Sequence, residues 1–108
     1  MQLNEYQKLA ARTINHALDA SQQLLNGCMG LCGEAGEVID ILKKHLAQGH
    51  PLDCERIKDE LGDVMWYVAQ TATALGITLD DVAIYNVSKL GKRYPVGFES
   101  ERSINREG

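Results

Sequence analysis

The sequence predicts an all-α fold, a single domain built as a bundle of four to five helices. Three observations favour this class. Apolar residues recur at helical spacing in successive segments, helix start and stop signals separate those segments, and no useful length of strand-like alternation occurs. A length of 108 residues suits one domain with one modest core. We therefore expect residues 1–108 to form one unit, with 94–108 as a tail or lid segment.

The first predicted helix covers residues 4–17. Asn4 is suited to the N-cap position, because its side-chain oxygen can accept a hydrogen bond from a free backbone N–H. Four residues then fall on one face at helical spacing: Tyr6, Ala10, Ile14 and Ala17. Residues 19–21 interrupt the pattern.

The second predicted helix has the clearest pattern in the chain and ends at Gly49, before His50 and Pro51. Its apolar and small residues recur at spacings of three and four, which is typical of a packed seam: Leu25, Cys28, Cys32, Ala35, Ile39, Leu42 and Leu46. We expect the two cysteines to pack in the core with this seam rather than to bind zinc. Glycines every third residue predict a close helix crossing: Gly27, Gly30, Gly33 and Gly36.

Two more helices follow. Asp53 is suited to cap the third, whose apolar stripe continues until Gly76 stops it: Ile57, Leu61, Val64, Val68 and Leu75. Thr78, with Asp81 three residues later, resembles a capping box and opens a fourth helix through about Leu90.

Composition limits the possible partners. The net charge of -4 argues against binding to a nucleic acid polymer, because such binders need a basic face to displace counterions. No apolar run approaches membrane length and no secretory leader is evident, so we expect no membrane partner. Three cysteines, an odd number, argue against a disulfide framework and suit the reducing cytoplasm.

Two acidic pairs are candidates for a metal site. Glu34 and Glu37 lie three residues apart on the second helix, as do Glu60 and Asp63 on the third. Two antiparallel helices can point all four carboxylates at one place, and such crowded like charges need a cation. Ligand sets made only of oxygen suit Mg²⁺ or Mn²⁺. The alternative is that both pairs are ordinary solvated faces.

The context of these acids resembles a known family. Gly33-Glu34-Ala35-Gly36-Glu37, followed after 22 residues by Glu60-Leu61-Gly62-Asp63, is similar to the ExxE–spacer–ExxD signature of the MazG-like, all-α NTP pyrophosphatases. The stretch from Asn86 to Lys89 and on to Pro95 resembles that family's closing motif. The resemblance implies that the four acids bind magnesium. Many members have a second Glu where this chain has Gly33, and we predict Glu34 as the general base.

The closing motif supplies the candidate substrate contacts. Asn86, Lys89 and Arg93 line one face if the fourth helix persists to Arg93. Lys and Arg suit a polyphosphate, Asn can hydrogen-bond a sugar or base, and the resemblance favours ligand binding by this motif, including Tyr94. Tyr67 is a candidate for stacking on the base. The alternative for the basic residues is that they only complement the helix dipole.

The resemblance thus implies a Mg²⁺-dependent nucleoside triphosphate pyrophosphohydrolase, which converts a (d)NTP and water to a (d)NMP and pyrophosphate in nucleotide-pool housekeeping. A phosphoribosyl-ATP pyrophosphohydrolase and a non-catalytic helical interaction module are the alternatives. The second helix offers more apolar face than its neighbours in one chain can cover. Members of the family that this chain resembles are dimers or tetramers. Together with the uncovered apolar face, the resemblance predicts a homo-oligomer, either a dimer or a tetramer.

Overall fold

The computed structural model describes residues 1–106, and within them the chain forms five helices and no strand. The helices are α1 (Leu3–Ala11), α2 (Ala20–Gln48), α3 (Cys54–Ala74), α4 (Leu79–Arg93) and α5 (Ser100–Ile104). The predicted all-α fold is confirmed. The short helix α5 lies inside the segment that the sequence suggested as a tail or lid.

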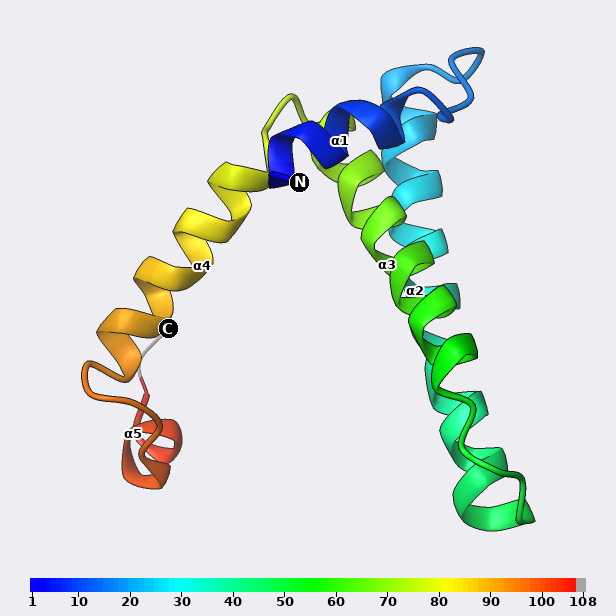
Figure 1. The fold of residues 1–108 in the computed structure, drawn as a ribbon. Helices are drawn as coiled ribbons and strands as arrows, with labels where there is room; N and C mark the ends of the chain where they lie inside the picture. The colour runs from blue at the N-terminus through cyan, green and yellow to red at the C-terminus, as the bar shows by residue number, and fades with distance from the viewer. Residues whose placement is uncertain (107–108) are drawn as a thin grey trace.

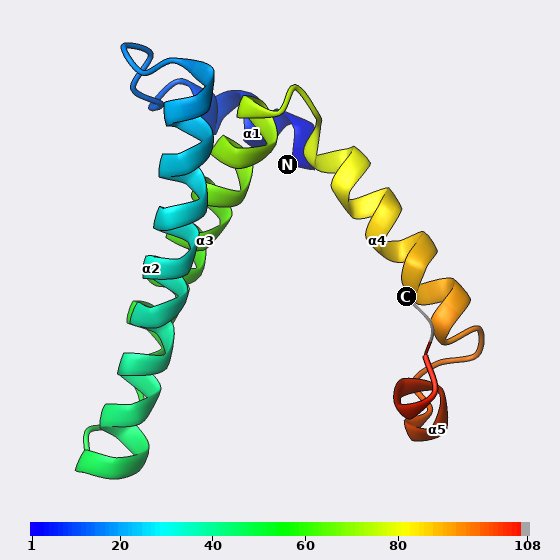
Figure 2. The same cartoon turned by 180° about the vertical axis from the view of Figure 1, so that it is seen from behind.

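The helices form two arms that diverge from a common corner (Figure 1). Helices α2 and α3 run antiparallel as a long hairpin, and α1 lies across the end of that hairpin. Helix α4 leaves the corner in a different direction and carries α5 at its far end, as the view from behind also shows (Figure 2). Helix α4 packs mainly against α1, so it stands apart from the hairpin.

Most predicted helix ends are confirmed by the hydrogen bonds that cap them. The Asp53 carboxylate accepts from Arg56 N, and the Thr78 hydroxyl accepts from Asp81 N. Gly49 ends α2 in the left-handed conformation at φ 73°, which costs glycine little. A capping box that the sequence analysis did not identify opens α2, where Asp19 and Gln22 each accept a hydrogen bond from the other's backbone N–H.

The prediction for the first helix was wrong at both ends. The N-cap is Gln2, and the helix stops at Ala11, six residues early. Thr13 explains the stop, because its hydroxyl donates to the Ala10 carbonyl and accepts from the Trp66 indole N–H. Asn4 caps a different helix, since its side-chain oxygen accepts from Asp80 N in the first turn of α4.

The expectation that Cys28 and Cys32 pack in the core was also wrong for this chain, in which much of the apolar seam of the second helix is exposed. Leu25, Ile39 and Leu46 are 61%, 61% and 73% exposed, and both Cys28 and Cys32 are exposed rather than packed in the core. The opposite face of α2 meets α3, and its buried residues are Gly27 and Ile41. The helical spacing correctly identified an apolar face on α2, but that face does not pack against α3.

The predicted close helix crossing occurs at two of the four glycines. A β-carbon on Gly27 would collide with Thr71, and one on Gly30 would collide with the Tyr67 ring. A β-carbon on Gly33 or Gly36, in contrast, would have no atom of another described element within 4 Å. The absence of side chains at Gly27 and Gly30 therefore lets α2 and α3 approach closely in the upper half of the hairpin.

A buried glutamine fastens the corner where the arms meet. Gln7 is 9% exposed, its amide donates to Thr73 Oγ1 and the Ile77 carbonyl, and its oxygen accepts from Leu79 N at 2.8 Å. These bonds satisfy backbone groups of the turn between α3 and α4 that would otherwise be buried without partners. The side chains around this point form a small core cluster: Ala10, Ala69, Ala72 and Leu79.

The chain exposes more surface than a compact protein of its mass. Its accessible area is 7858 Å², whereas folded monomers of this mass expose about 5,900 Å². Its radius of gyration is 16.9 Å, against about 13 Å for a compact domain of this length. Within residues 1–106, no helix is both long enough and apolar enough to span a membrane.

Candidate active site

Three of the four predicted metal ligands meet between the two helices of the hairpin. Glu34 comes from α2, and Glu60 and Asp63 come from α3. One carboxylate oxygen from each lies within 4.8 Å of the others. Glu37, the fourth predicted ligand, is exposed on α2 and does not belong to this group.

The helix geometry explains why these three acids converge. Glu60 and Asp63 are one turn apart on α3, so they share a face. Glu34 is half-buried because it lies on the face of α2 that meets α3, opposite the exposed Ile39. The close approach at Gly27 and Gly30 brings the two backbones together one to two turns away.

The electrostatics of the group are unfavourable for the bare protein. Hydrogen bonding with the Glu34 carboxyl is the largest cause that raises the pKa of Glu60, and burial and the charges of Glu34 and Asp59 add to it. Burial is the largest cause that raises the pKa of Asp63, followed by the charges of Asp59 and Glu60. The Glu60 Oε2 atom is buried and has no hydrogen-bond partner within residues 1–106. A cation at this point would satisfy that oxygen and relieve the repulsion.

Tyr6 is a neighbour of this group that the sequence analysis placed only on an apolar face. It packs against the core cluster from α1. Burial raises the pKa of its hydroxyl, and the negative charge of Asp63 raises it further. The sequence carries no signal for this proximity, because it depends on α1 crossing the end of the hairpin.

Tyr67, the predicted base-stacking residue, lies one turn beyond Asp63 on α3. Its ring is half-buried against Gly30 of α2, and the Trp66 ring meets it edge to face with centroids 5.0 Å apart. Trp66 itself packs against the core cluster. Tyr67 is therefore held close to the acids, with part of its ring accessible.

The predicted phosphate-binding residues lie on the other arm. Helix α4 does persist to Arg93, so Asn86, Lys89 and Arg93 share one helix as the spacing required. Lys89 and Arg93 line an open groove of about 510 Å³ along α4, and Asn86 is exposed beside it. Tyr94 follows the end of α4, and its ring lies 5.4 Å from the Phe98 ring between centroids, with the two planes tilted by 42°. Because the arms diverge, one chain does not bring these residues to its own acids (Figures 1 and 2).

Comparison with known proteins decides the family. Residues 22–98 match the model of the MazG nucleotide pyrophosphohydrolase domain, a span that includes both acidic pairs and the closing motif. The chain belongs to the MazG family. It is also 39% identical over 92 residues to the Gene 37 protein of Mycobacterium phage L5, covering 82% of this chain and 81% of that protein. No solved structure matches the chain.

Membership of the MazG family gives the acid cluster its chemical meaning. MazG domains are nucleotide pyrophosphohydrolases, and the family is generally metal-dependent. Three carboxylates, one with a buried oxygen that lacks a hydrogen-bond partner in the described part of the chain, form a hard, all-oxygen donor set that fits a divalent cation of the magnesium type. The residues present therefore fit the metal that the family implies.

Proposed function

We propose that this protein is a Mg²⁺-dependent nucleoside triphosphate pyrophosphohydrolase that converts a (d)NTP and water to a (d)NMP and pyrophosphate. The observation that carries the proposal is the convergence of Glu34, Glu60 and Asp63 in a MazG-family chain, together with a buried Glu60 oxygen that has no hydrogen-bond partner within residues 1–106. Nucleotide-pool housekeeping in the cytoplasm is the setting that this activity suits.

The acids divide the work of the reaction in this proposal. Glu34, Glu60 and Asp63 would hold Mg²⁺, and Glu37, which is exposed one turn from Glu34 on α2, would be the fourth ligand. When bound, Mg²⁺ supplies charge neutralisation of the triphosphate and lowers the pKa of water. Glu34 accepts a proton from the attacking water, a role that suits a half-buried carboxylate beside Glu60 and Asp63.

The other predicted residues bind the rest of the substrate. Lys89 and Arg93 contact the phosphates, with Arg93 offering a planar fork and Lys89 a point charge. Asn86 hydrogen-bonds the sugar or base, and Tyr67 and Tyr94 offer ring faces for the base. Water attacks phosphorus at the α–β linkage, and pyrophosphate leaves.

A homo-oligomer completes the site in this proposal. The acids and the basic residues lie on separate arms of one chain, so a second copy has to supply one of the two sets. The excess exposed area of about 1,900 Å² supports this assembly, because it falls within the range of about 1,000–2,500 Å² per subunit that obligate dimers bury.

The deciding experiment measures pyrophosphate release from a panel of ribo- and deoxyribonucleoside triphosphates, with Mg²⁺ and with EDTA. We expect Mg²⁺-dependent turnover in the native chain. Asp63→Asn and Glu37→Gln should each lower it by at least about a hundredfold, because each removes a charged ligand and keeps the shape. Glu5→Gln, which removes an exposed carboxylate on α1, is the matched control and should leave turnover unchanged.

Thermal unfolding of each variant shows whether a loss of activity reflects misfolding. Turnover of the native kind in folded Asp63→Asn would refute the metal site. Absence of divalent-metal binding in the native protein would favour the non-catalytic interaction module instead.

A further inference from the structure

The groove along α4 has two ends of different chemistry. It measures about 510 Å³, and all the residues that line it belong to α4. At the end near the corner of the molecule its lining includes Ile84 and Tyr85, and at the far end it includes Lys89 and Lys92. A cavity of about 340 Å³, lined mainly by apolar side chains, adjoins the first end and shares Tyr85 with the groove. A ligand that fills this groove therefore needs an apolar part and an anionic part.

Tyr85 is the side chain at the apolar end that is best placed to meet a ligand. It is 73% exposed, and its ring contacts no other aromatic ring within residues 1–106. Ile84 beside it is 63% exposed, so the two residues form an open apolar surface. An aromatic ring that is open to solvent can stack on a flat, aromatic ligand, and every nucleobase offers such a face.

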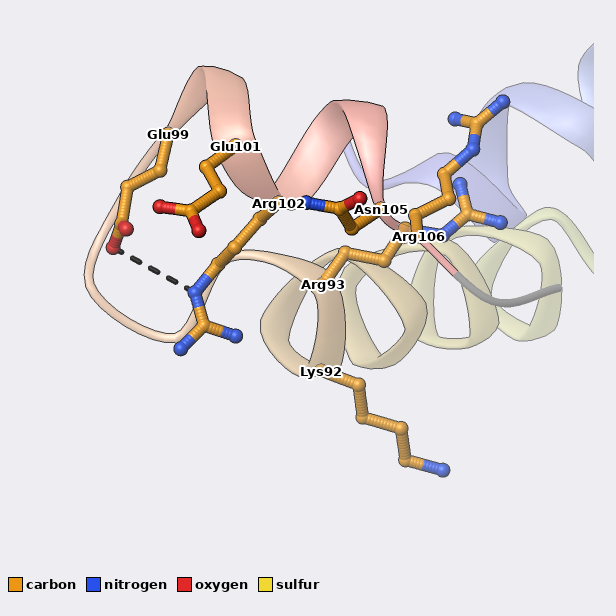
Figure 3. A pocket seen from close by; sticks show the side chains of 7 residues that line it. All are labelled: Lys92, Arg93, Glu99, Glu101, Arg102, Asn105 and Arg106. Carbon is orange, nitrogen blue, oxygen red and sulfur yellow. Dashed lines mark ion pairs between the residues drawn. The ribbon is translucent and has the colours of Figure 1, made fainter.

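The two lysines of the groove are available for an anion. In the described part of the chain neither Lys89 nor Lys92 forms an ion pair, whereas Lys43 and Lys44 on α2 both pair with Asp40. Figure 3, a close view of the far end of this arm, shows the Lys92 ammonium turned away from the side chains of α5. Two ammonium groups on one helix face attract a ligand with more than one negative charge, such as the phosphates of a nucleotide.

The order of the groups along α4 matches the order of the parts of a nucleotide. Asp81, Tyr85 and Lys89 follow one another at intervals of four residues, so each step advances about 6 Å along the helix axis on one face. Lys92 lies nearly one turn further on. In an extended nucleotide the hydrogen-bonding edge of the base, its ring and the phosphates have the same order. Asp81 lines both the groove and the adjoining cavity, and its carboxylate accepts hydrogen bonds but donates none.

We propose that the face of α4 from Asp81 to Lys92 is the nucleoside-binding part of the substrate site. Tyr85 stacks on the base, and Asp81 accepts from an amino group of the base, which favours cytosine, adenine and guanine over uracil and thymine. The proposal deepens the proposed function and rests on it, since Lys89 is already placed at the phosphates. A base has two faces, so Tyr85 leaves the second face for a ring from the hairpin of another copy, such as its Tyr67.

The test is titration calorimetry of the full chain with Mg²⁺. The ligands are inorganic tripolyphosphate and the α,β-methylene analogues of dCTP and dUTP, which the proposed reaction cannot cleave. Tyr85→Leu should weaken binding of both analogues about tenfold, the effect of one lost base stack, and change tripolyphosphate affinity by less than about twofold. Tyr85→Phe keeps the ring and should bind both analogues within about twofold of the native chain. Val87→Ala, at an exposed apolar residue of α4 outside the groove, is the matched control and should leave all three affinities unchanged.

Asp81→Asn tests the selection of the base. The native chain should bind the dCTP analogue about tenfold more tightly than the dUTP analogue, because Asp81 accepts from the cytosine amino group and faces a carbonyl in uracil. Asparagine can also donate to that carbonyl, so the variant should bind the two analogues within about twofold of each other. A native chain that binds both analogues equally would overturn the role of Asp81.

Three results would overturn the base contact of Tyr85. Tyr85→Leu would bind the analogues as tightly as the native chain, or lose affinity for the analogues and tripolyphosphate equally, or show a lower mass than the native chain by light scattering. The last result would assign Tyr85 to the contact between copies. The proposed function fails separately, because no titration measures hydrolysis. A native chain that binds the analogues through Tyr85 but releases no pyrophosphate from any triphosphate would refute hydrolysis and leave the nucleoside site standing.

Discussion

At the scale of single residues, Glu60 is the side chain whose surroundings demand the most explanation. One of its oxygens is buried without a partner within residues 1–106, and the Glu34 carboxyl lies beside it. A buried acceptor without a donor costs free energy, and so does an adjacent like charge. Both penalties disappear when a cation binds. The arrangement is therefore better suited to ligand binding than to stability.

The raised pKa values of Glu60 and Asp63 predict how stability depends on pH without metal. An acid whose pKa is higher in the folded protein stabilises the fold in its protonated form, and this contribution is lost as pH rises through the folded pKa. We therefore expect the melting temperature of the metal-free protein to fall as pH rises above the ordinary values of about 4. Saturating Mg²⁺ should reverse the fall at neutral pH.

Glu60→Gln supplies the control for this pH dependence, because it removes the charge and nearly keeps the shape. Melting curves in EDTA should show a smaller fall for this variant than for the native chain. An identical slope in both proteins would mean that the acids near Glu60 do not determine the pH dependence of stability.

Residue-scale predictions from the sequence succeeded where the chemistry is local. Asp53 and Gly49 act at helix ends within a few residues of themselves, so their roles are visible in sequence. Asn4 has the same cap chemistry but serves α4, 76 residues away, and Tyr6 meets Asp63 across the fold. No sequence pattern distinguishes a local cap from a distant one.

At the scale of elements, α2 has one face that packs against α3 and an apolar face that is exposed in one chain. One face carries Gly27, Gly30 and Glu34 and meets α3; the other carries Leu25 and Ile39 and is exposed. Helical periodicity detects an apolar stripe but does not reveal which neighbour covers it. The face of α2 against α3 consists of small and acidic residues, so its hydrophobic periodicity is weaker than that of the exposed apolar face.

The glycines of α2 provide a test of this division. Gly27→Ala should lower the free energy of unfolding by about 1–3 kcal/mol, because its β-carbon would meet the Thr71 side chain and come within 3.2 Å of the Thr71 backbone nitrogen. Gly33→Ala is the matched control, since it lies in the same helix and its added β-carbon would meet no other part of residues 1–106 within 4 Å. It should raise stability by up to about 1 kcal/mol through helix propensity.

Urea unfolding of the two variants measures both effects. Equal stability changes at Gly27 and Gly33 would show that α2 and α3 do not cross as closely as described. Cys28 and Cys32 illustrate the same limit of the sequence, because their place on the apolar stripe suggested burial and the structure exposes them.

At the scale of the whole molecule, the two arms carry opposite charges: the acids of the candidate site lie on the α2–α3 hairpin and a basic segment lies on the α4–α5 arm. Residues 89–106 carry five Lys or Arg and two Glu, a net charge of +3, although the whole chain is at -4. The acids of the candidate site lie on the hairpin, which diverges from that basic segment (Figure 1). The sequence predicted both sets of residues but not their separation, because the direction of α4 is set by Gln7 and the turn it holds.

The last prediction is that the purified protein is a dimer or larger at micromolar concentration. The exposed face of α2 carries Leu25, Cys28, Cys32, Ile39 and Leu46, a larger apolar stripe than soluble monomers leave open. Light scattering coupled to size exclusion should give at least twice the chain mass of 11.9 kDa.

Two variants connect this assembly to the face that would form it. Leu25→Glu combined with Ile39→Glu should give a monomer with little turnover, because burying two carboxylates in an apolar contact is costly. Leu52→Glu, at an exposed apolar residue in the turn between α2 and α3, is the matched control and should keep the native mass. Thiol labelling is a second measurement, in which Cys54 should react faster than Cys28 and Cys32, since only the latter two lie on the paired face. A native chain that is monomeric and still hydrolyses triphosphates would refute both the pairing and the completion of the site by a second copy.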